Sequence, residues 1–115
     1  MEKCRDKFAA YLTRRYGDRS TPKHYLNDLD MFIQQVGAVN PSDVTMQQID
    51  EFIDRQQARG LKPATLNRRL ASLHTFFEFI ASEGIYPELI NPVQWRRHRI
   101  KEGNYLPRDA SDKDV

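Results

Sequence analysis

The sequence predicts an all-α fold, a bundle of four helices followed by a C-terminal tail. Apolar residues recur at helical spacing in four segments, and each segment has its own start and stop signal. No stretch alternates apolar and polar residues with a period of two, which is the pattern of a half-buried strand. The chain has 115 residues, of which 39% are hydrophobic. That is enough for one hydrophobic core and too little for two ordinary domains.

The first two predicted helices each end at a glycine. The first spans residues 3–16 and ends at Gly17. The second follows the hydroxyl cap Thr21 and begins at Pro22, because proline suits the first helical position, where its missing N–H has no helical partner. Gly37 supplies its left-handed stop. The apolar stripes consist of Cys4, Phe8, Tyr11 and Leu12 in the first helix and Tyr25, Leu29, Phe32, Ile33 and Val36 in the second.

The third and fourth predicted helices follow a turn at residues 40–43. Thr45 and Gln48 have the spacing of a capping box at the start of the third helix, which ends at Gly60. The fourth helix is the longest and spans residues 63–83, with Gly84 after it. Their buried stripes consist of Ile49, Phe52 and Ile53, and of Leu66, Leu70, Leu73, Phe77 and Ile80. Phe79 lies off the second stripe, which predicts a central helix with neighbours on more than one side.

Prolines interrupt the pattern after residue 84, at Pro87, Pro92 and Pro107. We therefore divide the chain into a helical domain, residues 1–84, and a linker, residues 85–115, with one short helical turn near residues 93–97. The run Ser-Asp-Lys-Asp at 111–114 is typical of a helix cap followed by acids in the first turn. Two interpretations stay open: a helix of a further domain that begins here, or a frayed acidic tail.

Catalytic and metal-binding patterns are absent from the sequence. His24, His74 and His98 do not have the spacing of a zinc-binding pair, and Cys4 is the single cysteine. There is no Gly-rich phosphate loop and no nucleophile elbow. The apolar stretches are too short to span a bilayer, and the N-terminus lacks the apolar region of a signal peptide. We therefore expect no metal, no cofactor, no membrane contact and a cytoplasmic location.

Basic and hydroxyl side chains gather at two predicted helix starts and in the tail. Free N–H groups at a helix start attract anions, and a basic face of this kind suits phosphate and base contacts on duplex DNA. The net charge of +2 decides nothing by itself. The alternative interpretation is ordinary capping with solubilising charges. The candidate DNA-binding residues are Lys23 and His24 in the second helix, Lys62, Thr65, Asn67, Arg68, Arg69 and Ser72 in the fourth, and Arg96, Arg97 and Arg99 in the tail.

The order of these motifs resembles the N-terminal core-binding domain of tyrosine recombinases of the Xer and phage-integrase type. Residues 61–80 look like its last helix, in which a threonine and arginines precede Leu-x-x-Leu-x-x-Phe-Phe, and residues 20–29 look like its helix with Ser/Thr, Tyr and Asp-Leu. Residues 91–108 are similar to the interdomain linker, and residues 111–115 to the first turn of the catalytic domain. His74 departs from the family, where a basic residue is common.

The resemblance implies an orthogonal four-helix SAM-like bundle that clamps one side of a duplex during DNA integration or recombination. It further implies a catalytic domain in cis, other protomers assembled on the DNA, and metal-free cleavage through a phosphotyrosine link. None of the family's catalytic residues can be placed on this chain, so we expect a fragment that binds DNA and does not cut it. On the sequence alone, Arg68→Ala and Lys62→Ala are expected to weaken DNA binding with little change in melting temperature.

Two other functions stay open. A stand-alone helical DNA-binding regulator would need to dimerise for useful affinity. A SAM-like protein-interaction module would show no salt-dependent duplex binding and would expose an apolar patch. Trp95 also has two interpretations, an anchor of the tail on the bundle, which we favour, or a DNA contact.

Overall fold

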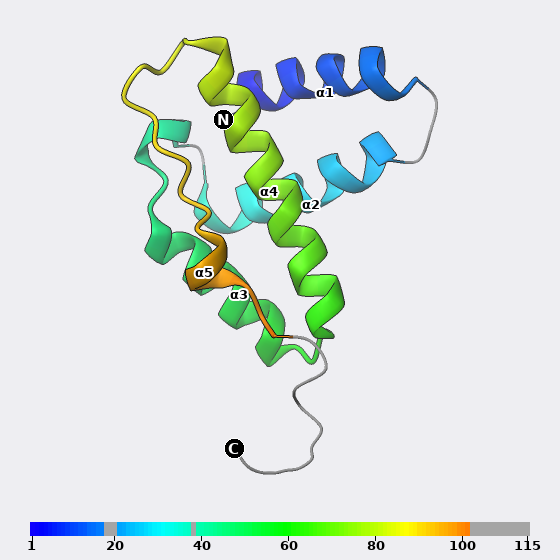
Figure 1. Cartoon of the computed structure of the whole chain (residues 1–115), viewed down its shortest axis with the longest axis vertical. Helices are drawn as coiled ribbons and strands as arrows, with labels where there is room; N and C mark the ends of the chain where they lie inside the picture. Colours follow the sequence, from blue (N-terminus) through cyan, green and yellow to red (C-terminus); the bar gives the residue numbers. More distant parts are fainter. Residues whose placement is uncertain (18–20, 38, 102–115) are drawn as a thin grey trace.

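A computed structural model of the chain describes residues 1–17, 21–37 and 39–101, and these ranges contain helices and no strand (Figure 1). This confirms the all-α prediction. The interpretation of residues 111–114 lies outside the described residues. The elements are α1 (Glu2–Tyr16), α2 (Thr21–Val36), the 3₁₀ turn η1 (Pro41–Asp43), α3 (Met46–Ala58), α4 (Pro63–Glu83) and α5 (Trp95–His98).

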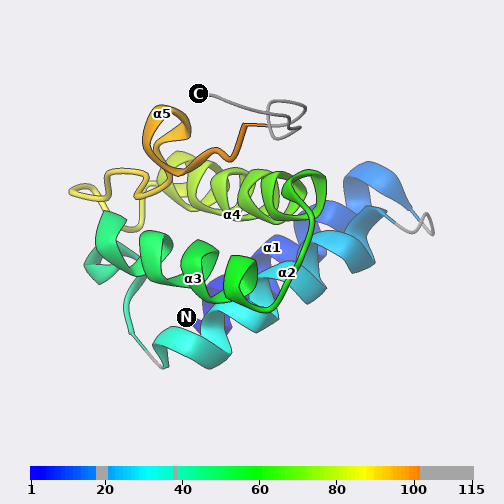
Figure 2. The same ribbon diagram turned by 90° about the horizontal axis from the view of Figure 1, so that it is seen from below.

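The longest helix, α4, is the centre of the fold and contacts α1, α2 and α3. Figure 2 shows α5 on one side of α4 and α2 on the other. The central position of α4 agrees with its sequence, because its apolar side chains lie on more than one face of the helix. Phe79, which lies off the main stripe, packs against α1, with its ring centroid 4.8 Å from that of Tyr11.

Two adjacent phenylalanines on α4, Phe76 and Phe77, pack against different helices within the same core. Phe76 points toward α1, where its ring lies 5.4 Å from that of Phe8, centroid to centroid. Phe77 points toward α2, where Phe32 lies 6.4 Å away and in turn meets Phe52 of α3 at 5.5 Å. These edge-on aromatic contacts fill the space between all four long helices, and all five rings are almost completely buried.

Local signals fix the helix ends. The Thr45 hydroxyl accepts from the backbone N–H of Gln48, and the Gln48 side chain accepts from the backbone N–H of Thr45, which confirms the predicted capping box. Gly84 ends α4 with φ of 73°, a left-handed conformation that residues with a side chain adopt at a cost. The chain then turns back along the bundle (Figure 1).

The segment after α4 packs on the bundle over part of its length. Val93 is only 3% exposed and belongs to the main core, and the Asn91 side chain donates a hydrogen bond to the backbone oxygen of His74 on α4. The short helix α5 lies where a helical turn was expected and contacts α3. The division of the chain at residue 84 into a domain and a linker stays a prediction. Within the described ranges, no helix combines the length and hydropathy that crossing a bilayer requires.

Candidate nucleic-acid interface

A surface hollow lies where α2 crosses α4, and it brings together candidate DNA-binding residues from these two helices. Its volume is about 220 Å³, and it is lined by His24, Tyr25, Arg68, Ala71 and Ser72. We call it the α2–α4 hollow. His24 is exposed at the start of α2, and the side chain of Arg68 is 45% exposed. An imidazole and a guanidinium from different helices therefore share one concave site.

A buried carboxylate lies next to this hollow. Asp28 of α2 is 1% exposed, and its Oδ2 accepts hydrogen bonds from Arg68 Nη1 at 2.9 Å and from Ser72 Oγ at 2.7 Å. The Nε atom of Arg69 lies 3.8 Å from the other oxygen, Oδ1. A buried charge is costly unless it is paired, and these partners provide the pairing. Ser72 is itself 3% exposed, so its hydroxyl serves the carboxylate more than the surface.

Asp28 is not among the residues predicted from the sequence to form the site, although its position carries a signal. Asp28 follows Tyr25 by three residues and precedes Phe32 by four, which places it on the buried stripe of its helix. A charged residue on such a stripe requires a partner of opposite charge inside the fold. The only missing information was which basic residue that partner is.

Other candidates at the start of α4 differ in what they contact. Lys62 is the N-cap residue, is exposed, and makes no side-chain capping bond, while Thr65 is half-buried. Lys23, at the start of α2, is exposed as well. Because Pro63 occupies the first turn and no side chain caps it, the N-terminus of α4 keeps its attraction for an anion.

Two of the predicted DNA-binding residues, Asn67 and Arg69, have hydrogen-bond partners within the protein. The Asn67 side-chain amide donates to the backbone oxygen of Ile100 at 2.6 Å and accepts from the Ile100 N–H at 2.9 Å. The side chain of Arg69 is 14% exposed and donates to Gln56 Oε1. We therefore leave Asn67 and Arg69 out of the interface proposed below.

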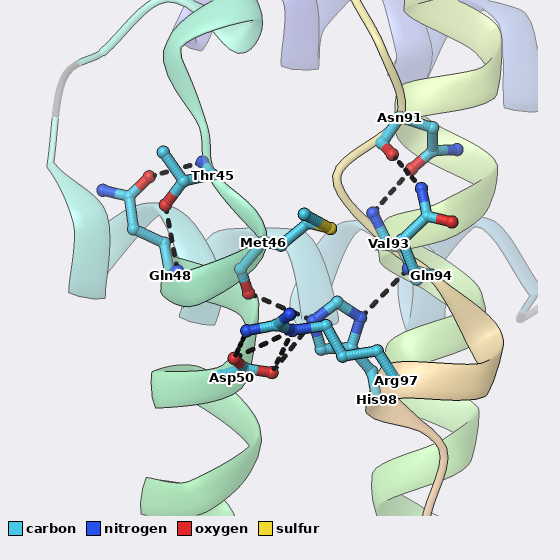
Figure 3. Close-up of polar contacts among 9 residues, drawn as sticks. All are labelled: Thr45, Met46, Gln48, Asp50, Asn91, Val93, Gln94, Arg97 and His98. Atoms are coloured by element: carbon cyan, nitrogen blue, oxygen red, sulfur yellow. Dashed lines mark hydrogen bonds and ion pairs between the residues drawn. The ribbon is translucent and has the colours of Figure 1, made fainter.

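The three tail arginines, Arg96, Arg97 and Arg99, differ in whether they have an acidic partner in the protein. Arg97 forms an ion pair with Asp50 of α3, with Nη2 2.5 Å from Oδ2 and Nε 3.1 Å from Oδ1 (Figure 3). The hydrogen bond from Arg97 lowers the pKa of the Asp50 carboxyl, and the same contact raises the pKa of Arg97. Arg96 and Arg99 are exposed and have no ion pair within residues 1–17, 21–37 and 39–101. They remain candidates for phosphate contact.

The buried anchor of the tail is His98, a role that sequence reasoning missed. The His98 side chain has no exposed surface. Its Nδ1 accepts from the backbone N–H of Gln94 at 3.0 Å, so the proton lies on Nε2, which is 3.0 Å from the backbone oxygen of Met46 and 3.1 Å from Asp50 Oδ1 (Figure 3). Trp95, the anchor favoured from the sequence, is 39% exposed, with its ring 5.5 Å from that of His74.

The described part of the chain contains no group of three or more His, Cys, Asp or Glu side chains that could hold a metal ion. Of the candidate residues, the α2–α4 hollow is lined by His24, Arg68 and Ser72. The others lie elsewhere on α2 and α4 or in the tail.

Comparison with known proteins agrees with this architecture. The family described as phage integrase, N-terminal SAM-like domain, matches residues 6–84. The tyrosine recombinase XerC of Thermodesulfovibrio yellowstonii is 34% identical over 88 residues, which cover 76% of this chain and 28% of that protein. XerC of Pelotomaculum thermopropionicum is 29% identical over 117 residues, 94% of this chain and 33% of that protein. A tyrosine recombinase of Agathobacter rectalis is 25% identical over 97 residues, 84% of this chain and 31% of that protein.

No solved structure matches the chain. The chain spans about a third or less of the length of the curated relatives that it matches. The family match covers most of the sequence and includes α2, α3, α4 and most of α1. The chain therefore belongs to the phage integrase N-terminal SAM-like domain family.

Proposed function

We propose that this chain binds duplex DNA as the core-binding part of a site-specific tyrosine recombinase, clamping one side of the duplex at the recombination site. The observation that carries the proposal is the α2–α4 hollow, where His24 and Arg68 from two helices line one concave site. The relatives named tyrosine recombinase support the same reading. Cleavage and rejoining would belong to a catalytic domain in a longer protein, acting with other protomers on the DNA.

The proposed interface consists of basic and hydroxyl groups that can reach phosphate oxygens. Arg68 has donors to spare, because a guanidinium carries five N–H groups and Asp28 accepts from Nη1 alone. Phosphate contacts fix position and carry no direct sequence information, so the target site must be read by further contacts or by DNA shape. The proposed contacts are Lys23, His24, Lys62, Thr65 and Arg68 on the helices and Arg96 and Arg99 in the tail.

A salt series tests this proposal. If about four to six phosphates are neutralised, the logarithm of affinity should fall with the logarithm of salt concentration at a slope of roughly −4 to −5. Fluorescence anisotropy with a labelled duplex measures this slope. Lys62→Ala should make it shallower by about one. Arg14→Ala is the matched control, because Arg14 is exposed on α1, lines a separate hollow with Tyr11 and Glu83, and carries the same charge.

The protein-interaction alternative has one observation in its favour. Ile90 is 81% exposed and Met46 is 38% exposed, and both line a second hollow beside Val44 and Pro92. This apolar surface lies at the start of α3 and on residues 90–92, and it shares no lining residue with the α2–α4 hollow. If duplex affinity does not change with salt concentration, the DNA-binding proposal is wrong and a protein-binding module is the better supported function.

A further inference from the structure

Asp28 is an acidic side chain buried beneath a surface that we propose to contact a polyanion. It is 1% exposed on α2, and its partners, Arg68, Ser72 and Arg69, all lie on α4. By Coulomb attraction alone, a carboxylate in this place opposes DNA binding, because it removes one unit of positive charge from the interface. Its burial therefore needs an explanation beyond the attraction of the surface for phosphate.

Asp28 holds the guanidinium of Arg68 through one nitrogen, Nη1, and leaves part of the side chain exposed to solvent. Oδ2 accepts from Arg68 Nη1 at 2.9 Å and from Ser72 Oγ at 2.7 Å, so the serine hydroxyl also fixes the carboxylate. The Ser72 hydroxyl lies 3.3 Å from the backbone oxygen of Arg68, one helical turn earlier. The rest of the Arg68 side chain, 45% exposed, lines the α2–α4 hollow.

We infer that Asp28 is a positioning residue that holds the guanidinium of Arg68 at the rim of the α2–α4 hollow, ready to receive a DNA phosphate. The inference rests on the proposed function. A long arginine side chain normally loses conformational freedom when it binds, and a guanidinium that is already held loses less. Charge removal and loss of positioning then act in opposite directions when Asp28 is changed, which makes the inference testable.

The variant Asp28→Asn separates the two effects because it keeps the size of the side chain and removes its charge. Electrostatics alone predicts that Asp28→Asn tightens duplex binding. Loss of positioning predicts that it weakens binding, by about fivefold, and that the effect disappears when Arg68 is absent. A double-mutant cycle of wild type, Asp28→Asn, Arg68→Ala and the double variant, measured by anisotropy at one salt concentration, isolates the effect transmitted through Arg68.

The expected result is weaker binding by Asp28→Asn in the wild-type background and no weakening in the Arg68→Ala background. Tighter binding, or equal weakening in both backgrounds, overturns the inference while the salt slope of the wild type still supports DNA binding. A wild type that does not bind duplex overturns both. Circular dichroism melting establishes that each variant is folded at the assay temperature.

A second measurement needs neither a variant nor DNA. Nitrogen-15 relaxation of the arginine Nε–H groups reports side-chain order on the ps–ns timescale in the free protein. Arg68 should be clearly more ordered than Arg96, which is exposed on α5. Equal mobility of the two side chains overturns the inference, even where Asp28→Asn is too unstable for the binding assay.

Discussion

The side chain of Asn67 on α4 and the backbone of Ile100 form a closed pair of hydrogen bonds, 2.6 Å from Asn67 Nδ2 to the Ile100 oxygen and 2.9 Å from the Ile100 N–H to Asn67 Oδ1. One amide thus satisfies both backbone groups of a residue 33 positions later. The arrangement gives Asn67 a role in holding the C-terminal segment, residues 91–101, on the central helix.

The first prediction concerns this pair. Asn67→Ala should lower the free energy of unfolding by about 1–2 kcal/mol, because two hydrogen bonds are lost and the backbone of Ile100 is left to water. Urea denaturation measures the loss, and hydrogen exchange at the Ile100 amide should accelerate. Duplex affinity should stay within about twofold of the wild type. Asn27→Ala, at an exposed position of α2, is the control. A variant of Asn67 that keeps its stability but loses DNA affinity would contradict this role.

The second prediction revises the expectation from sequence for Arg68. Arg68→Ala should lower the free energy of unfolding by about 1–2 kcal/mol, because it leaves the buried carboxylate of Asp28 with fewer partners. The loss is at the low end for a buried pair, since Arg68 is itself half exposed and solvent screens the contact. Arg96→Ala, at an exposed position, should change stability by less than about 0.5 kcal/mol. Similar melting temperatures for both variants would refute the prediction.

The third prediction is a pH dependence that follows from the lowered pKa of Asp50. A carboxyl whose pKa is lower in the folded state stabilises the fold above its ordinary pKa, and this contribution is lost as the pH falls through the folded pKa. The stability difference between the wild type and Arg97→Ala should therefore be present at neutral pH and shrink below about pH 4. Urea titrations across this range measure it. Arg96→Ala, which removes the same charge at an exposed position next to Arg97, is the control and should show no such pH-dependent difference.

The fourth prediction tests the core. Ile49 is 0% exposed, and Ile49→Val should lower the free energy of unfolding by about 0.5–1.5 kcal/mol through the loss of one buried methylene. Ile85→Val removes the same group at a site that is 48% exposed, and it should cost less than about 0.5 kcal/mol. Equal losses at both positions would mean that the residue assigned to the core is not tightly packed.

The elements predictable from sequence are those governed by neighbouring residues. The bounds of α4, residues 63–83, agree with the proline that begins it and the glycine that follows it. The Thr45–Gln48 capping box connects residues three apart. Such signals depend on local backbone geometry, which sequence patterns report directly. The order of the four long helices followed from the same reasoning.

The polar contacts of the candidate site were not predictable in the same way. Asp28 and Arg68 are 40 positions apart, and Arg97 and Asp50 are 47 apart. Which acid meets which base depends on how α2 and α3 cross α4, and periodicity does not give crossing geometry. For this reason the sequence placed Asn67, Arg69 and Arg97 among the DNA-binding candidates, although each also contacts a specific protein group.

The buried imidazole of His98 ties the end of the C-terminal segment to α3, while Asn67 ties it to α4. Two independent attachments on different helices prevent rotation about either one. The backbone at Ile100 is therefore held in one orientation relative to α3 and α4. A paramagnetic or fluorescent probe at Lys101 is thus expected to tumble with the whole bundle.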